Sequence, residues 1–205
     1  MSDREKWDER YSERGYAMGE EPSAFLVEHL DVIIREAPGR VALDVACGEG
    51  RNSIALARAG FDVFGVDISD AGLEKARDRA QRDGLAISFE HLDLSAEDVP
   101  DGPFDVIVVF NYLQRDLLPK LYARLSDGGF LVMESILATP GSSSHHRSDF
   151  TLAPGELARL FEDYKGTVLV AREDGADERA RLLFRKEGGN ATGEAAEKVA
   201  GEAAG

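Results

Sequence analysis

The chain has 205 residues, of which 43% are hydrophobic and 31% charged, a balance typical of one globular domain. Its formal net charge of −15 argues against nucleic acid as a partner, because binding phosphates requires basic side chains. A single cysteine excludes a disulfide within the chain, and four scattered histidines disfavour a metal site. The sequence has no signal-peptide pattern and no apolar run of membrane length, so we expect a cytoplasmic protein with no membrane contact.

From residue 40 onward, patterns typical of strands and helices alternate. Apolar runs predict strands at 40–46, 61–67, 86–94, 104–110 and 130–137. Helical spacing and end signals predict helices at 51–60, about 69–81 and 117–125, and a short one at 154–161. The SDGG run at 126–129 predicts a turn, and two closing strands at 166–173 and 179–186 predict an antiparallel hairpin.

This alternation predicts an α/β fold, a Rossmann-like three-layer sandwich with a parallel sheet between two layers of helices. Ligands of such sheets bind beyond the carboxyl ends of the strands, near the switch in strand order. The 46–52 loop, Asp67, Asp93 and Asn111 each follow a predicted strand. We therefore expect them to lie along one edge of the sheet.

The stretch LDVACGEGRNS at 43–53 predicts a glycine-rich turn between a strand and a helix, where nucleotide-like ligands bind. A dinucleotide would need G-x-G-x-x-G to hold its pyrophosphate. Gly48 and Gly50 supply the first two glycines, but Ser53 replaces the third and Glu49 adds a negative charge. A dinucleotide-dependent oxidoreductase is therefore the less favoured alternative.

S-adenosylmethionine has no phosphate and carries an ammonium and a sulfonium, so carboxylates near the loop suit it. Asp44 lies just before the loop, Asp67 could accept hydrogen bonds from both ribose hydroxyls, and Asp93 from the adenine amino group. Each has a structural alternative, since Asp44 could pair with a backbone group and Asp93 could cap the following turn.

Four motifs in order resemble the class I S-adenosylmethionine-dependent methyltransferases: LDVACGEG (43–50), VDIS (66–69), DL (93–94) and LSDGG (125–129). WDERY (7–11), GRNS (50–53), NYLQRDL (111–117) and PGELARLF (154–161) are similar to segments of the tellurite-resistance methyltransferase-like branch. The resemblance covers about residues 5–186. It implies S-adenosyl-L-methionine as the cofactor and a seven-stranded, mostly parallel sheet with a C-terminal antiparallel hairpin.

The resemblance also implies one domain over 1–186, in which residues 1–37 form a helical cover over the cofactor. The Gly/Ala/Glu-rich tail, 187–205, is expected to be disordered, because it can bury little apolar surface. The expected cofactor-binding residues are Trp7, Tyr11, Arg14, Asp44, Ala46, Cys47, Gly48, Gly50, Asn52, Asp67, Ile68, Asp93, Leu94 and Asn111. Trp7 could instead anchor a core, and Asn111 could form a turn.

The expected reaction is in-line transfer of the sulfonium methyl group to a small molecule: a thiol, a chalcogen oxyanion or a small organic acceptor. No residue stands out as a general base; the candidates on the acceptor side are Tyr112, Arg115, His145 and His146. The two histidines could equally belong to a solvated loop. A non-catalytic regulatory protein that binds S-adenosylmethionine stays open, and the acidic surface suggests a monomer or homodimer.

Overall fold

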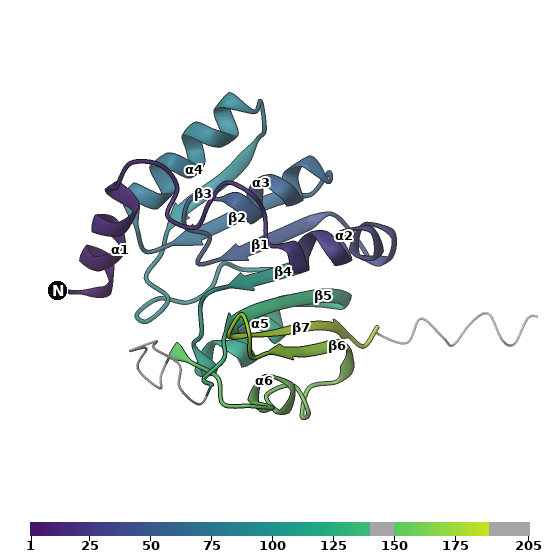
Figure 1. Ribbon diagram of the computed structural model, residues 1–205. Helices are drawn as coiled ribbons and strands as arrows, with labels where there is room; N and C mark the ends of the chain where they lie inside the picture. Colours follow the sequence, from purple (N-terminus) through teal and green to yellow (C-terminus); the bar gives the residue numbers. More distant parts are fainter. Residues whose placement is uncertain (140–149, 189–205) are drawn as a thin grey trace, which may run out of the picture.

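A seven-stranded sheet lies between two layers of helices in the computed structural model, which describes residues 1–139 and 150–188 (Figure 1). The strands are β1 (Val41–Val45), β2 (Asp62–Asp67), β3 (Ile87–His91), β4 (Phe104–Phe110), β5 (Leu125–Ile136), β6 (Gly166–Asp174) and β7 (Arg179–Lys186). The helices are α1 (Asp3–Ser12), α2 (Ala24–Glu36), α3 (Arg51–Arg58), α4 (Asp70–Arg82), η1 (Arg115–Leu117), α5 (Leu118–Arg124) and α6 (Glu156–Arg159). The predicted α/β sandwich is confirmed.

The strand order is β3-β2-β1-β4-β5-β7-β6. The first five strands pair in parallel, and β7 pairs antiparallel with both β5 and β6. The predicted mostly parallel sheet with a closing antiparallel hairpin is therefore confirmed. The order reverses between β1 and β4, so the loops after these two strands flank the switch point at which ligands of α/β sheets bind.

The two apolar cores lie on opposite faces of the sheet, as the period-2 alternation of strand side chains requires. On one face, Phe25, Leu26 and Ile33 of α2 pack with Ala42, Val106 and Val132. On the other, Leu118, Leu121 and Leu157 of α5 and α6 pack with Leu43, Ile107 and Met133. All seven residues of β4 are buried, so the sheet is covered on both faces where the order reverses.

The predicted turn at 126–129 is wrong. Strand β5 begins at Leu125 and includes those residues, while its register against β4 shifts between Phe104 and Val106. Gly128 has a φ of 78°, which only glycine adopts readily. Glycine and serine that read as a turn in the sequence therefore form an irregularity inside a longer strand.

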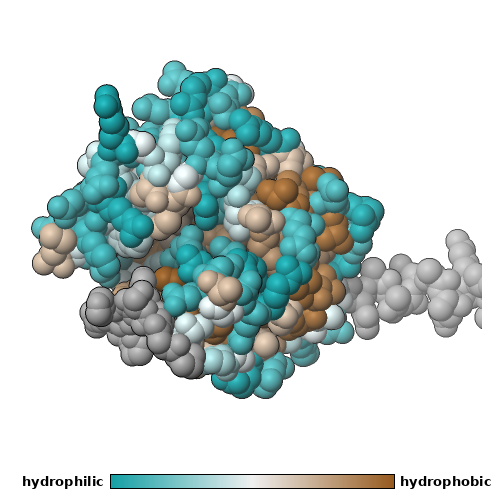
Figure 2. Space-filling model, in the orientation of Figure 1, coloured by the Kyte–Doolittle hydropathy of each residue, from teal (hydrophilic) through white to brown (hydrophobic). Residues whose placement is uncertain are grey.

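Figure 2 shows a mostly hydrophilic surface in the view of Figure 1, with apolar patches gathered on the side of α2. The large apolar side chains that stay exposed include Val27 of α2 and Val168 and Leu169 of β6. None of the described helices has the length and apolarity that a membrane crossing requires.

Candidate functional site

The loop between β1 and α3 turns through three left-handed residues, with φ values of 54° at Ala46, 53° at Gly48 and 76° at Gly50. The Cys47 N–H donates to the Val66 carbonyl of β2, and the Gly50 N–H donates back to the Cys47 carbonyl. The loop is thus fixed to the neighbouring strand. Ala46 stays in a conformation that is costly for a residue with a Cβ, which is typical of ligand-binding turns.

Asp67, the last residue of β2, ties this loop to the start of α4. One carboxylate oxygen accepts the Gly48 N–H at 2.7 Å, and the other accepts the Ser69 N–H at 2.9 Å. Asp44 lies one strand away and accepts the Ser53 hydroxyl of α3 at 2.6 Å. Both carboxyl groups are buried, with 2% of Asp44 and 5% of Asp67 exposed.

Burial sets the protonation of these two groups. Desolvation, with the nearby charge of Asp67 adding to it, raises the pKa of Asp44 to about 7, although the Ser53 hydroxyl works against the shift. Desolvation also raises the pKa of Asp67, against the hydrogen bonds from Ser69 and Gly48. The base of the glycine loop therefore favours either protons or a cationic ligand.

The loops after β3 and β4 meet next to the two buried carboxyl groups of Asp44 and Asp67. Because β3 ends at His91, Asp93 and Leu94 lie in its loop, where one oxygen of Asp93 accepts both the N–H and the hydroxyl of Ser95. After β4, the Tyr112 hydroxyl donates to Gln114 at 2.5 Å, and the Gln114 amide donates to the Leu94 carbonyl at 3.2 Å. Gln114 therefore connects the two loops.

Asn111 and Tyr112 begin the loop after β4. Asn111 has a left-handed φ of 57°, and its N–H donates to the Glu134 carbonyl of β5. Burial, with Asp93 nearby, raises the pKa of Tyr112 to about 12. Tyr112 therefore stays protonated at neutral pH and serves better as a hydrogen-bond donor than as a base.

Helix α1 lies over the glycine loop. Tyr11 is 6% exposed and stacks on Trp7 with ring centroids 5.4 Å apart. Its hydroxyl oxygen lies so close to Gly48 that a Cβ on this glycine would be 2.6 Å away. Glycine is thus required here for Tyr11 to pack. Arg14, in the loop after α1, is exposed.

Asp8 anchors α1 at the N-terminus of α4, accepting the Ser69 hydroxyl at 2.6 Å and the Ala71 N–H at 3.2 Å. Burial alone would raise the pKa of Asp8, but these hydrogen bonds and Arg4 hold it below its ordinary value. A carboxylate at the positive end of a helix dipole stabilises this docking.

Residues 42–129 match a family model described as a methyltransferase domain. The chain is also 27% identical over 130 residues to the probable S-adenosyl-L-methionine-dependent methyltransferase TehB of Haemophilus influenzae, an alignment covering 60% of this chain and 45% of that protein. Residues 42–129 therefore carry a methyltransferase domain, and the chain is similar to TehB over 60% of its length. The crystal structure of H. influenzae TehB has the same fold, with a TM-score of 0.66 at 22% identity over 81% of this chain and 64% of that chain.

Other relatives of the methyltransferase domain bear different names. The chain is 32% identical over 143 residues to hemagglutinin 1 of Eikenella corrodens, covering 64% of this chain and 47% of that protein. It is 29% identical over 146 residues to the ribosomal protein L11 methyltransferase of Vibrio campbellii, covering 68% and 48%. The chain spans about half the length of the curated relatives it matches.

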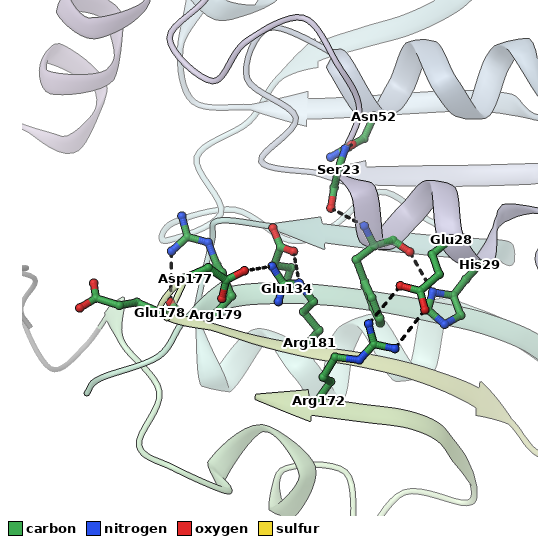
Figure 3. A network of polar contacts seen from close by, with 11 residues as sticks. Ser23, Glu28, His29, Asn52, Glu134, Arg172, Asp177, Glu178, Arg179 and Arg181 are labelled. Carbon is green, nitrogen blue, oxygen red and sulfur yellow. Dashed lines mark hydrogen bonds and ion pairs between the residues drawn. The ribbon is translucent and has the colours of Figure 1, made fainter. Parts of the chain in front are cut away.

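Several expected site residues of the methyltransferase domain have structural partners. Asn52 is buried and accepts the Ser23 N–H at the start of α2 (Figure 3). Cys47 is buried, and desolvation with nearby Asp44 raises the pKa of its thiol, so it stays neutral. Arg115 donates to the Glu156 carboxylate at 2.6 Å and to the Thr151 carbonyl.

The structure brings Tyr11, Gly48, Gly50, Asp44 and Asp67 together. Ile68, half-buried, follows Asp67 directly. His145 and His146 lie outside the described residues. Arg181 of β7 lies between Glu134, at 2.7 Å, and Asp177 (Figure 3).

Further residues of the site were not predicted from the sequence: Asp8, Gln114 and Lys75, whose contacts join segments far apart in the chain. Asp8 and Gln114 lie within the quoted WDERY and NYLQRDL motifs, which was the available signal. Lys75 is one of several basic residues on α4, and nothing in its local sequence distinguishes it.

Proposed function

We propose that this protein binds S-adenosylmethionine at the edge formed by the glycine loop, Asp67 and Asp93, and transfers its methyl group to a small molecule. The observation that supports this most is the pair of buried carboxyl groups, Asp44 and Asp67, beside the loop. A cationic ligand would compensate them, whereas the pyrophosphate of a dinucleotide would be repelled.

The residues present fit such a ligand. Each oxygen of Asp67 accepts one backbone N–H and retains a second lone pair, so the carboxylate could still accept from a ribose diol. In Asp93, Ser95 occupies only Oδ1, which leaves Oδ2 for an adenine amino group. Ile68 and Leu94, next in sequence to these aspartates, would flank the base.

The amino-acid end of the ligand would lie at Gly48 and Gly50, under Tyr11 and Trp7. Arg14 would meet its carboxylate, and Ala46, Cys47 and Asn111 would approach mainly through their backbones. When bound, S-adenosylmethionine supplies a sulfonium methyl group that a nucleophile displaces in line. The protein itself would align the reactants and exclude water, and the burial of Tyr11 contributes to that exclusion.

For the acceptor we infer a thiol, a chalcogen oxyanion or a small organic molecule. A soft nucleophile needs no general base, which agrees with a Tyr112 whose pKa of about 12 keeps it protonated. Arg115 and Arg181 are each paired with carboxylates, so they position the acceptor region more than they bind a free anion. The relative named for ribosomal protein L11 makes a protein acceptor the competing outcome of a screen.

We also propose that residues 1–186 act as one domain, with the cover within 1–37, and that the protein works in the cytoplasm as a monomer or homodimer. Sedimentation velocity on the full chain tests the assembly: a species larger than a dimer would contradict it.

Calorimetric titration with S-adenosylmethionine, S-adenosylhomocysteine and NADH tests the cofactor. We expect micromolar binding of the first two and weaker binding of NADH. Asp67→Asn should weaken binding about tenfold or more, because hydrogen bonds to a charged group contribute roughly 1.5–3 kcal/mol. Asp62→Asn, at the exposed opposite end of β2, is the matched control. Tighter binding of NADH would support the oxidoreductase instead.

Turnover separates an enzyme from a regulatory binding protein. A screen of thiols, selenite, tellurite and small organic acceptors with methyl-labelled S-adenosylmethionine should yield a methylated product. Binding of the cofactor without turnover of any of these, or of ribosomal protein, would favour the regulatory alternative.

A further inference from the structure

Glu49 lies between the two glycines of the loop, and its charge is already paired. It is 5% exposed. One carboxylate oxygen accepts the Lys75 ammonium of α4 at 3.0 Å, and the other accepts the Ala17 N–H at 2.8 Å. The carboxylate that the sequence puts next to the ligand therefore faces the N-terminal segment.

Lys75 completes the connection from the other side. Besides Glu49, its ammonium donates to the carbonyls of Glu13, at 2.9 Å, and Gly15, at 2.6 Å. All three N–H groups of one lysine are used, two of them on the loop that follows α1. The pair therefore joins residues 13–17 to the glycine loop.

Two more basic side chains hold the next part of this segment. Arg51 of α3 donates to the Met18 carbonyl at 2.9 Å, and the 6% exposed Arg79 of α4 donates to the Glu20 carbonyl at 2.5 Å. Among these contacts, the Glu49–Lys75 pair is the one that joins residues 13–17 to the residue between Gly48 and Gly50. A displacement of residues 13–17 would thus be transmitted to Gly48, on which Tyr11 packs.

We propose that Glu49 is a positioning residue for the cofactor: paired with Lys75, it holds the N-terminal segment closed over the glycine loop and so sets how long a bound cofactor stays. The proposal rests on the proposed function for the identity of the ligand. A charge pair with a nearly buried carboxylate suits this role, because removing one partner leaves the other uncompensated and opens the contact.

The test uses Lys75→Met, which keeps most of the side-chain length and removes the ammonium. Without ligand, trypsin should cleave after Arg10 or Arg14 about tenfold faster than in the wild type, as read by intact mass. S-adenosylhomocysteine should dissociate about tenfold faster in stopped-flow displacement. Adding Glu49→Gln to Lys75→Met should bring both the cleavage rate and the dissociation rate part of the way back to the wild-type values, because no unpaired carboxylate remains.

The matched control is Arg58→Met, which breaks an ion pair of 2.7 Å to Asp83 between α3 and the end of α4, away from the cover. It should leave both rates unchanged, and Lys75→Arg should behave like the wild type. Near-UV circular dichroism verifies that each variant is folded. If Lys75 had a purely structural role, Lys75→Met would have a lower melting temperature but wild-type rates of cleavage and dissociation. That outcome would overturn the proposal.

Failure of the proposed function gives a different result. If the wild type binds no S-adenosylhomocysteine but Lys75→Met is still cleaved faster in the cover, the tether stands and the cofactor assignment falls. If the wild type binds and the variant matches it in both assays, the tether falls and the cofactor assignment stands.

Discussion

Asp44 is a buried carboxyl group that lies near a second buried carboxyl group, that of Asp67. The sequence predicted its position at the end of β1, and the structure adds its partner, the Ser53 hydroxyl at 2.6 Å. Burial raises the pKa of Asp44 to about 7, and Asp67 adds a like charge, although the Ser53 hydroxyl and backbone N–H work against the shift. The charge state of this residue therefore varies within the physiological pH range.

The raised pKa of Asp44 makes the fold less stable as pH rises. A raised pKa means that the folded protein holds the proton more tightly than the unfolded chain does. The stability that this contributes is complete below the unfolded pKa near 4 and is lost as pH rises through 7. We expect the wild-type free energy of unfolding to fall between pH 5 and pH 8, by about 2–3 kcal/mol from this group, because the folded pKa lies about two units above pH 5.

Asp44→Asn removes the titrating group and should flatten that decline, as measured by urea denaturation at the two pH values. Asp62→Asn, an exposed carboxyl on β2, is the control and should keep the wild-type decline. Equal declines in Asp44→Asn and the wild type would show that Asp44 is ionised throughout.

At the scale of elements, the close approach of the start of α3 to α4 depends on Gly50. This residue is the N-cap of α3 and has a φ of 76°. A Cβ on it would lie 2.9 Å from the Ala76 Cβ of α4 and 3.3 Å from the Phe89 ring of β3. The GxG spacing was interpreted from the sequence as access for a ligand, and the structure shows that its second glycine also lets the start of α3 lie close to α4.

Gly50→Ala should therefore cost about 2–4 kcal/mol, combining left-handed strain of roughly 1–2 kcal/mol with the forced shift of α4. Gly60→Ala is the matched control, since its φ is 87° and no described atom lies within 4 Å of the added Cβ. It should cost only the strain. Chemical denaturation of the two variants measures the difference, and equal losses would show that α4 moves at no cost.

Elements were predicted best where one local pattern decides them. The apolar run of β4 and the Gly60 stop after α3 came out within one or two residues. The turn at 126–129 did not, because serine and glycine also suit a strand irregularity, and only pairing with β4 distinguishes the two. Local composition contains no information about the neighbouring strand.

For the whole molecule, the dominant feature is the net charge of −15. Several carboxylates are paired across the fold, as in Glu134–Arg181 between β5 and β7 and Glu28–Arg172 between α2 and β6 (Figure 3). These pairs join elements but leave the excess negative charge unbalanced. Such an excess destabilises the compact state through self-repulsion.

Raising NaCl from 0.05 to 0.5 M should therefore raise the melting temperature by a few degrees, since screening worth ~1 kcal/mol shifts a domain of this size by about 2–4 °C. Differential scanning fluorimetry at pH 7.5 checks this, with sodium sulfate avoided because it stabilises by exclusion. A lower melting temperature in salt would mean that the ion pairs outweigh the repulsion.

By itself, the sequence determined the order of strands and helices and the edge at which the glycine loop, Asp67 and Asp93 gather. Those follow from the period of apolar residues and from parallel strands ending together. Only the tertiary structure decided that Tyr11 packs on Gly48 and that Glu49 pairs with Lys75. These contacts join residues 37 and 26 positions apart, and the side chain that a residue meets across such a distance depends on how the elements pack.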